Sequence, residues 1–112
     1  MCDFKILLSD DHGYATQCFE CNHIEIAFGT SLIRFHIDRL AGFVKYLNKV
    51  KDSAKVIDQD LKNIHLDLAS MYSFQMILNY REITSLCERM ERVEDDVKAN
   101  ALLGLFNCQS DQ

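Results

Sequence analysis

The 112-residue sequence has no proline and only four glycines, at positions 13, 29, 42 and 104. Because the glycines are scattered, they do not form the glycine-rich loop that cradles phosphates in many nucleotide-binding proteins. The sequence also lacks a His-Glu-x-x-His motif and the ordered serine, histidine and aspartate of a hydrolase triad. These absences favour a chain without catalysis of its own.

Long hydrophobic runs and an excess of positive charge are missing as well. No apolar stretch approaches the ~20 residues that span a bilayer, so we expect no membrane association. Residues 1–5 do not begin a secretory signal, so we expect a cytoplasmic protein with reduced thiols. The net charge of −5 argues against nucleic-acid binding, because phosphate backbones favour basic surfaces.

The composition is that of one folded domain. Apolar residues make up 48% of the chain and charged residues 26%, which is typical of a globular protein. A chain of 112 residues builds one hydrophobic core and is too short for two ordinary domains. We therefore expect a single domain spanning residues 1–112.

The first 22 residues predict a β-hairpin. Residues 4–9 alternate in polarity, residues 10–13 have turn chemistry, and residues 14–19 return as the partner strand. A four-residue turn pairs Ser9 with Tyr14, and the same register continued backwards places Cys2 opposite Cys21.

A strand–strand–helix unit follows over residues 23–51. Gly29 and Thr30 form the two-residue turn of a second hairpin, with glycine first as a type II′ turn requires. A helical apolar stripe then runs from residue 37 to residue 50. The hairpin register predicts three cross-strand pairs: Ile24 with Phe35, Ile26 with Ile33, and Glu25 with Arg34.

A second such unit is expected over residues 63–106. Two alternating segments precede a helix that begins at Asn79, where Glu82 three residues later completes a capping box. The two units share one pattern, which suggests an internal repeat. Together with the N-terminal hairpin they predict an α+β fold: a largely antiparallel sheet of about six strands, with two helices on one face.

A cysteine cluster is the stretch that most suggests chemistry. Cys18 and Cys21 form a Cys-x-x-Cys pair, whose two-residue spacer lets two thiolates converge on one metal ion. The hairpin register adds Cys2, and His23 shares a strand face with Cys21. Cys2, Cys18, Cys21 and His23 are therefore candidate ligands of a structural zinc ion, with His36 as a rival fourth ligand.

Other readings of the chain stay open. Cys18 and Cys21 could instead be a thiol redox pair or simply buried cysteines. A small-ligand site on the uncovered sheet face would use His65, Asp67, Glu25 and Arg34. The C-terminal segment 99–106 is apolar nearly all round, which predicts a homodimer through this segment.

Several of these residues resemble a family of short uncharacterised bacterial proteins, a domain of unknown function. The resemblance rests on the Met-Cys start, Gly13-Tyr14, the Cys18–Cys21 pair and the segment 24–30, Ile-Glu-Ile-Ala-Phe-Gly-Thr. It implies that Cys2, Cys18 and Cys21 belong together, but it carries no activity. His36 stands where the family pattern implies a serine or threonine helix cap.

The interpretation that these observations favour is a small cytoplasmic binding or interaction module, with a candidate structural zinc site and a protein partner that the sequence does not name. A thiol-dependent redox protein and a small-ligand binder are the alternatives.

Overall fold

The structure is a computed structural model, and it describes residues 4–54, 58–68 and 75–110. The chain forms two compact units, one from residues 1–40 and 91–112 and the other from residues 41–90. The long C-terminal helix therefore contributes its residues 80–90 to the second unit and its residues 91–110 to the first.

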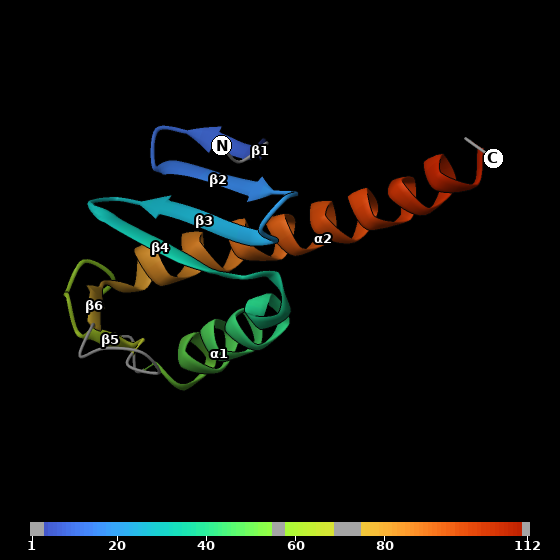
Figure 1. The fold of residues 1–112 in the computed structure, drawn as a ribbon. Helices are drawn as coiled ribbons and strands as arrows, with labels where there is room; N and C mark the ends of the chain where they lie inside the picture. The colour runs from blue at the N-terminus through green and yellow to red at the C-terminus, as the bar shows by residue number, and fades with distance from the viewer. Residues whose placement is uncertain (1–3, 55–57, 69–74, 111–112) are drawn as a thin grey trace. The chain divides into compact units, whose positions relative to one another are not determined.

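The first unit is built on a four-stranded antiparallel sheet. Its strands follow one another in chain order, as the blue to teal arrows of Figure 1 show. They are β1 (Phe4–Asp10), β2 (Gly13–Cys18), β3 (His23–Phe28) and β4 (Ser31–His36).

A short 3-10 turn, η1 (Ile37–Arg39), follows β4 and leads into α1 (Leu40–Ser53). The second unit then adds the hairpin β5 (Ile64–Asp67) and β6 (Gln75–Leu78), and residues 80–90 of α2 (Tyr80–Ser110).

An α+β fold with antiparallel strands is confirmed, but the single sheet of about six strands is wrong. Four strands form one sheet, while β5 and β6 pair only with each other among the described residues. A physical reason is that the backbone N–H of Asp67 on β5 donates to the hydroxyl of Tyr46 on α1, so a helix side chain and not a further strand engages this backbone group.

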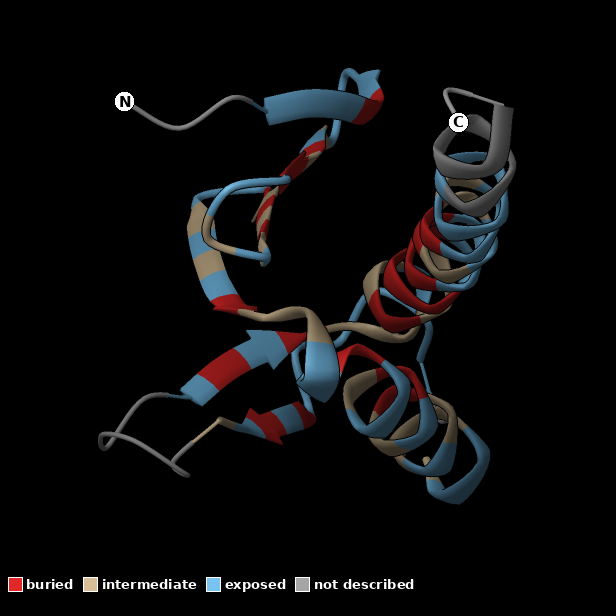
Figure 2. Ribbon diagram, turned by 45° about the vertical axis from the view of Figure 1, so that its right-hand side comes forward, coloured by how far each residue is buried: buried red, intermediate tan, exposed pale blue. Residues whose placement is uncertain are grey.

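The second hairpin has the predicted register. Ile24 pairs with Phe35, Ile26 with Ile33, and Glu25 with Arg34. Buried and half-buried residues alternate along β3, as the red and tan bands of the strands in Figure 2 show. Full burial of Ile24 stabilises the fold by about 2 kcal/mol.

The first hairpin departs from its predicted register because of a β-bulge. Ser9 pairs with Tyr14 as expected, but the register shifts between Ile6 and Leu8, so that Phe4 pairs with Cys18. Without this shift, the register that pairs Ser9 with Tyr14 would pair Phe4 with Phe19. The bulge also turns both Leu7 and Leu8 into the core, while Ile6 stays exposed, so one face does not hold Phe4, Ile6 and Leu8 together.

Glycine is required at one turn for a close approach. A Cβ atom on Gly13 would lie 1.9 Å from the carbonyl oxygen of Ala27 on β3, and its φ of +148° is one that side chains disfavour. At the next turn Gly29 has φ +60°, as the first position of a type II′ turn requires.

The predicted start of the last helix is confirmed in detail. The backbone N–H of Glu82 donates to Asn79 Oδ1 over 2.8 Å, and the N–H of Asn79 donates to Glu82 Oε1 over 3.0 Å. This reciprocal capping box satisfies two amide groups at the helix terminus that otherwise have no backbone partner.

Candidate functional site

The Cys18–Cys21 turn connects β2 to β3 and is held by backbone contacts. Cys18 is buried and Cys21 is half-buried. The N–H of Cys21 donates to Cys18 Sγ over 3.5 Å, which closes the turn locally. Asn22, with φ 57°, then turns the chain into β3.

His23 and His36 lie beside this turn. They pair directly across β3 and β4, and their rings meet edge to face with centroids 5.6 Å apart. His23 Nδ1 lies 2.9 Å from the carbonyl oxygen of Cys21. Because a carbonyl oxygen only accepts, the ring must carry its proton on Nδ1, and in the neutral ring Nε2 keeps a lone pair.

His36 has a double role at the end of β4. Its Nδ1 accepts a hydrogen bond from the N–H of Asp38 over 3.2 Å, which caps η1. The same nitrogen lies 3.3 Å from Asp38 Oδ2. The carboxylate can therefore accept a hydrogen bond from Nδ1 whenever that nitrogen carries a proton.

One backbone hydrogen bond connects the Cys18–Cys21 turn to the start of η1. The N–H of Ile37, directly after His36, donates to the carbonyl oxygen of Asn22 over 2.8 Å. The cysteine turn and the start of η1 are thus anchored to each other. The β2–β3 register ends at the Gln17–Ile24 pair, and one further step of that register would set Cys18 opposite His23, in a row with His36.

The predicted ligand set of Cys2, Cys18, Cys21 and His23 is placed only in part. Cys2 lies outside the described residues, and the bulge in β1 removes the register argument that set it opposite Cys21. Among the residues that the structure describes, no three of the types His, Cys, Asp and Glu are gathered closely enough to hold an ion. The zinc site therefore stays a prediction.

The thiol redox alternative gains no local support from the turn. Redox Cys-x-x-Cys pairs owe their low thiol pKa largely to a helix N-terminus. The Cys18–Cys21 turn joins two strands instead, so neither sulfur lies at the start of a helix.

The polar face of the four-stranded sheet carries a short network. Arg34 pairs with Glu25 and Glu25 with Thr16 across adjacent strands, and the Tyr14 hydroxyl donates to Glu25 Oε2 over 3.3 Å. Partial desolvation, together with the charge of the Glu25 carboxylate and its hydrogen bond, raises the pKa of Tyr14 above its ordinary value.

The four residues predicted for a small-ligand site do not share a sheet. Glu25 and Arg34 belong to the four-stranded sheet, whereas His65 and Asp67 lie on β5 of the second unit. The expectation of one common face is wrong, because it required all six strands to form one sheet.

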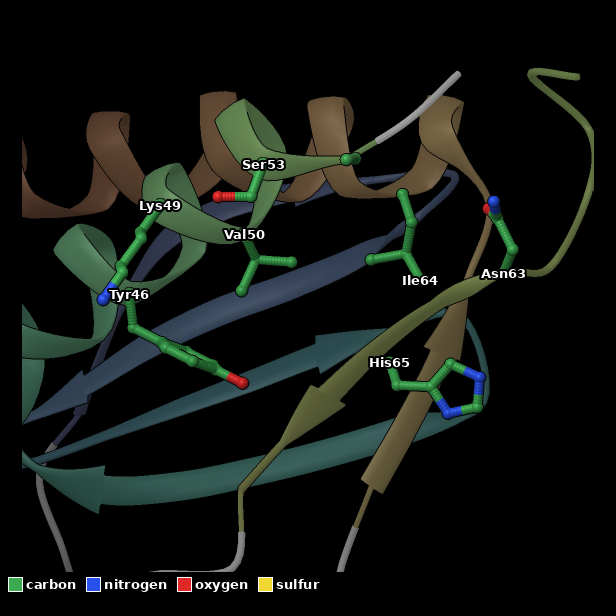
Figure 3. A pocket seen from close by; sticks show the side chains of 8 residues that line it. Tyr46, Lys49, Val50, Ser53, Asn63, Ile64 and His65 are labelled. Carbon is green, nitrogen blue, oxygen red and sulfur yellow. The ribbon is translucent and has the colours of Figure 1, made fainter. Parts of the chain in front are cut away.

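His65 is one of the residues that line a groove within the second unit. It has a volume of about 490 Å³, and the side chains of α1 and β5 line it (Figure 3). Val50 and Ile64 face each other across it and form its apolar part. Its polar groups come from Tyr46, Lys49, Ser53, Asn63 and His65.

Sequence reasoning missed the α1 wall of this groove, although a signal was present. Tyr46, Lys49, Val50 and Ser53 are spaced at i, i+3, i+4 and i+7, which puts them on one helix face. This mixed face shares Val50 with the apolar stripe of the same helix, and the stripe alone predicts burial and no groove.

Charge is unevenly divided between the two units. Residues 41–90 carry seven lysines and arginines against six aspartates and glutamates, a net charge of +1. The remaining residues carry five against eleven, a net charge of −6. The groove therefore lies in the unit with the small positive net charge, which repels an anion less than the acidic first unit does.

No protein-family profile, curated protein or solved structure matches this chain. The resemblance of residues 2–35 to a bacterial family accordingly stays a prediction.

Two further expectations concern partners. In the part of the chain that the structure describes, no helix combines the length and the apolar character needed to cross a membrane. Leu102 and Leu103 near the end of α2 are 59% and 57% exposed, and both lie in the segment from which a homodimer is predicted. Nothing tests that homodimer, so it stays a prediction.

Proposed function

We propose that this chain is a small binding module whose groove between α1 and β5 takes a small organic anion. The observation that supports the proposal is the chemistry of the lining. One ammonium group, four other polar side chains and an apolar patch line the groove, and no carboxylate among the described residues does.

The volume of the groove fits a ligand of this kind. Small-molecule sites commonly measure about 300–1,000 Å³ and combine apolar walls with a few placed polar groups. The Tyr46 hydroxyl already accepts the N–H of Asp67 over 2.9 Å, so its own proton remains available to a ligand oxygen. Lys49 supplies the opposite charge, and Val50 with Ile64 would contact the apolar body of the ligand.

The test is a titration of the full chain with benzoate, followed by the shifts of backbone amide resonances in NMR spectra. We expect shifts at groove residues and a Kd of about 1 mM, since a ligand of this size gains about −4 kcal/mol. Benzylamine has the same ring with the opposite charge, and it should bind at least about tenfold more weakly.

Lys49 and Lys45 provide a matched pair of variants. Both are exposed lysines on α1, but only Lys49 lines the groove. Lys49→Gln should weaken benzoate binding about tenfold, whereas Lys45→Gln should leave it unchanged. Equal effects of the two variants, or equal binding of benzoate and benzylamine, would show that general charge attraction explains the titration and that the groove does not.

A further inference from the structure

We propose that His23 and His36 act together as ligands of one transition-metal ion of the zinc class, with a thiolate of the Cys18–Cys21 turn completing the site. This differs from the sequence-based prediction, in which the two histidines are rivals for one position. The inference does not rest on the groove, because all of its residues belong to the first unit.

The spacing of the two rings is the first argument. With metal–nitrogen distances of about 2.0–2.1 Å and a tetrahedral angle, two imidazoles that share one zinc ion have centroids about 5 Å apart. The centroids of His23 and His36 are 5.6 Å apart without an ion. The spacing of the two rings is therefore close to the spacing that one shared ion requires.

The second argument is that both rings have the outer partners that metal-binding histidines use. Such histidines usually donate their second N–H to a backbone carbonyl or a carboxylate, which fixes the ring and the tautomer. His23 Nδ1 has the carbonyl of Cys21 at 2.9 Å, and His36 Nδ1 has Asp38 Oδ2 at 3.3 Å. In each ring this leaves Nε2 to bind the ion.

Binding exchanges one contact of His36 for another. When Nε2 holds the ion, the ring proton resides on Nδ1 and is donated to Asp38 Oδ2. Nδ1 then no longer accepts the N–H of Asp38, so the cap of η1 is given up. Asp38 is exposed, and water can satisfy its amide group.

A cysteine supplies the thiolate by a change of rotamer. Each cysteine of the turn can adopt three staggered χ1 rotamers, and each rotamer directs the sulfur differently. One further step of the β2–β3 register would set Cys18 in the row of the two histidines, and Cys21 precedes His23 by two residues. Coordination breaks the S–H bond and releases the proton to solvent, so the affinity for metal should rise with pH.

The experiment is a titration of the reduced full chain with Co²⁺ alone, followed by displacement with Zn²⁺. We expect one Co²⁺ per chain, the visible absorption of tetrahedral cobalt and a thiolate-to-cobalt charge-transfer band in the near ultraviolet. His36→Gln and His23→Gln should each weaken binding at least about tenfold. A charge-transfer band that survives in the Cys18→Ser, Cys21→Ser double variant would overturn the assignment of the thiolate.

His12→Gln and His65→Gln are the matched controls, because these exposed histidines lie in the β1–β2 turn and on β5 and are not among the proposed ligands. The proposal fails if the wild-type chain does not bind Co²⁺, or if the controls weaken binding as much as His36→Gln does. The His36 side chain is 42% exposed, so His36→Gln should fold even if His23→Gln does not.

Discussion

The hydroxyl of Tyr46 accepts a hydrogen bond from the backbone N–H of Asp67 across 2.9 Å. This contact links the middle of α1 to the last residue of β5, two elements separated by the loop that follows α1. It provides a partner for an amide at the edge of a two-stranded sheet, and it holds one wall of the groove in place.

Tyr46→Phe should lower the free energy of unfolding by about 1 kcal/mol, because the amide of Asp67 loses its partner while the packing of the ring is kept. Urea denaturation followed by circular dichroism measures the change. Tyr80→Phe is the control, since it removes the hydroxyl of another half-buried tyrosine, at the start of α2. An equal loss in both variants would contradict the role given to the Tyr46 hydroxyl.

Gly13→Ala should destabilise the chain by at least about 2 kcal/mol, because the new methyl group meets the carbonyl of Ala27 and the backbone must leave a conformation that alanine disfavours. Gly42→Ala tests the opposite case, since an added Cβ finds open space on α1. That variant should gain about 0.5–1 kcal/mol from helix propensity. Thermal unfolding of both variants decides the matter, and a neutral Gly13→Ala would refute the close approach.

Glu82→Gln should remove the negative charge of this residue and keep its hydrogen bond in the capping box, because glutamine also serves at this position. Burial would raise the pKa of Glu82, but hydrogen bonds from Lys62 and the Asn79 amide, with the charge of Lys62, outweigh it and lower the pKa. A carboxyl group with a lowered pKa in the folded state stabilises the fold above its ordinary pKa, and this stabilisation is lost as the pH falls through the folded value.

The stability difference between wild type and Glu82→Gln should therefore be about 0.5 kcal/mol near neutral pH and vanish in acid. Urea denaturation over a range of pH values measures it, with Glu88→Gln on the same helix as the control. A difference that persists unchanged in acid would rule out the ion pair with Lys62 as its source.

Glu25→Gln should lower the pKa of Tyr14 towards its ordinary value, because it removes the negative charge and the ionised acceptor beside the hydroxyl. NMR titration of the tyrosine ring carbons follows this one residue. Since the folded state holds the Tyr14 proton more tightly, the wild-type chain should also lose stability as the pH rises past the ordinary tyrosine value. Glu20→Gln, in the exposed turn after β2, should leave the Tyr14 titration where it is.

A Leu102→Glu, Leu103→Glu double variant tests the predicted homodimer. If the exposed leucines join two copies, the wild-type chain should sediment as a dimer at micromolar concentration. The variant should sediment as a monomer, because dimerisation would bury the charge of its glutamates. Leu61→Glu changes an exposed leucine elsewhere and should not alter the mass. A wild-type chain that sediments as a monomer would disprove the dimer.

The elements with strong local signals could be predicted from the sequence. Gly29 and the charge pair of Glu25 with Arg34 determine one register, so the β3–β4 hairpin is correct pair by pair. Asn79 and Glu82 likewise mark the start of α2 by chemistry that acts over three residues.

The errors concern interactions that local patterns do not encode. The bulge at Ile6 to Leu8 depends on packing, because it turns two consecutive leucines into the core. The separation of β5 and β6 from the larger sheet involves a hydrogen bond between Tyr46 and a strand 21 residues away. The groove was missed because its two walls come from segments on either side of a loop, and His65 was assigned to the wrong sheet.

The bulge has one more consequence, for the way in which chains meet. β1 forms the edge of its sheet and displays Phe4 and Ile6, both 61% exposed, which would favour pairing with the edge strand of another molecule. A bulge twists the strand and interrupts the even row of backbone groups that such pairing needs. The irregularity that spoiled the predicted register thus also protects the chain against edge-to-edge aggregation.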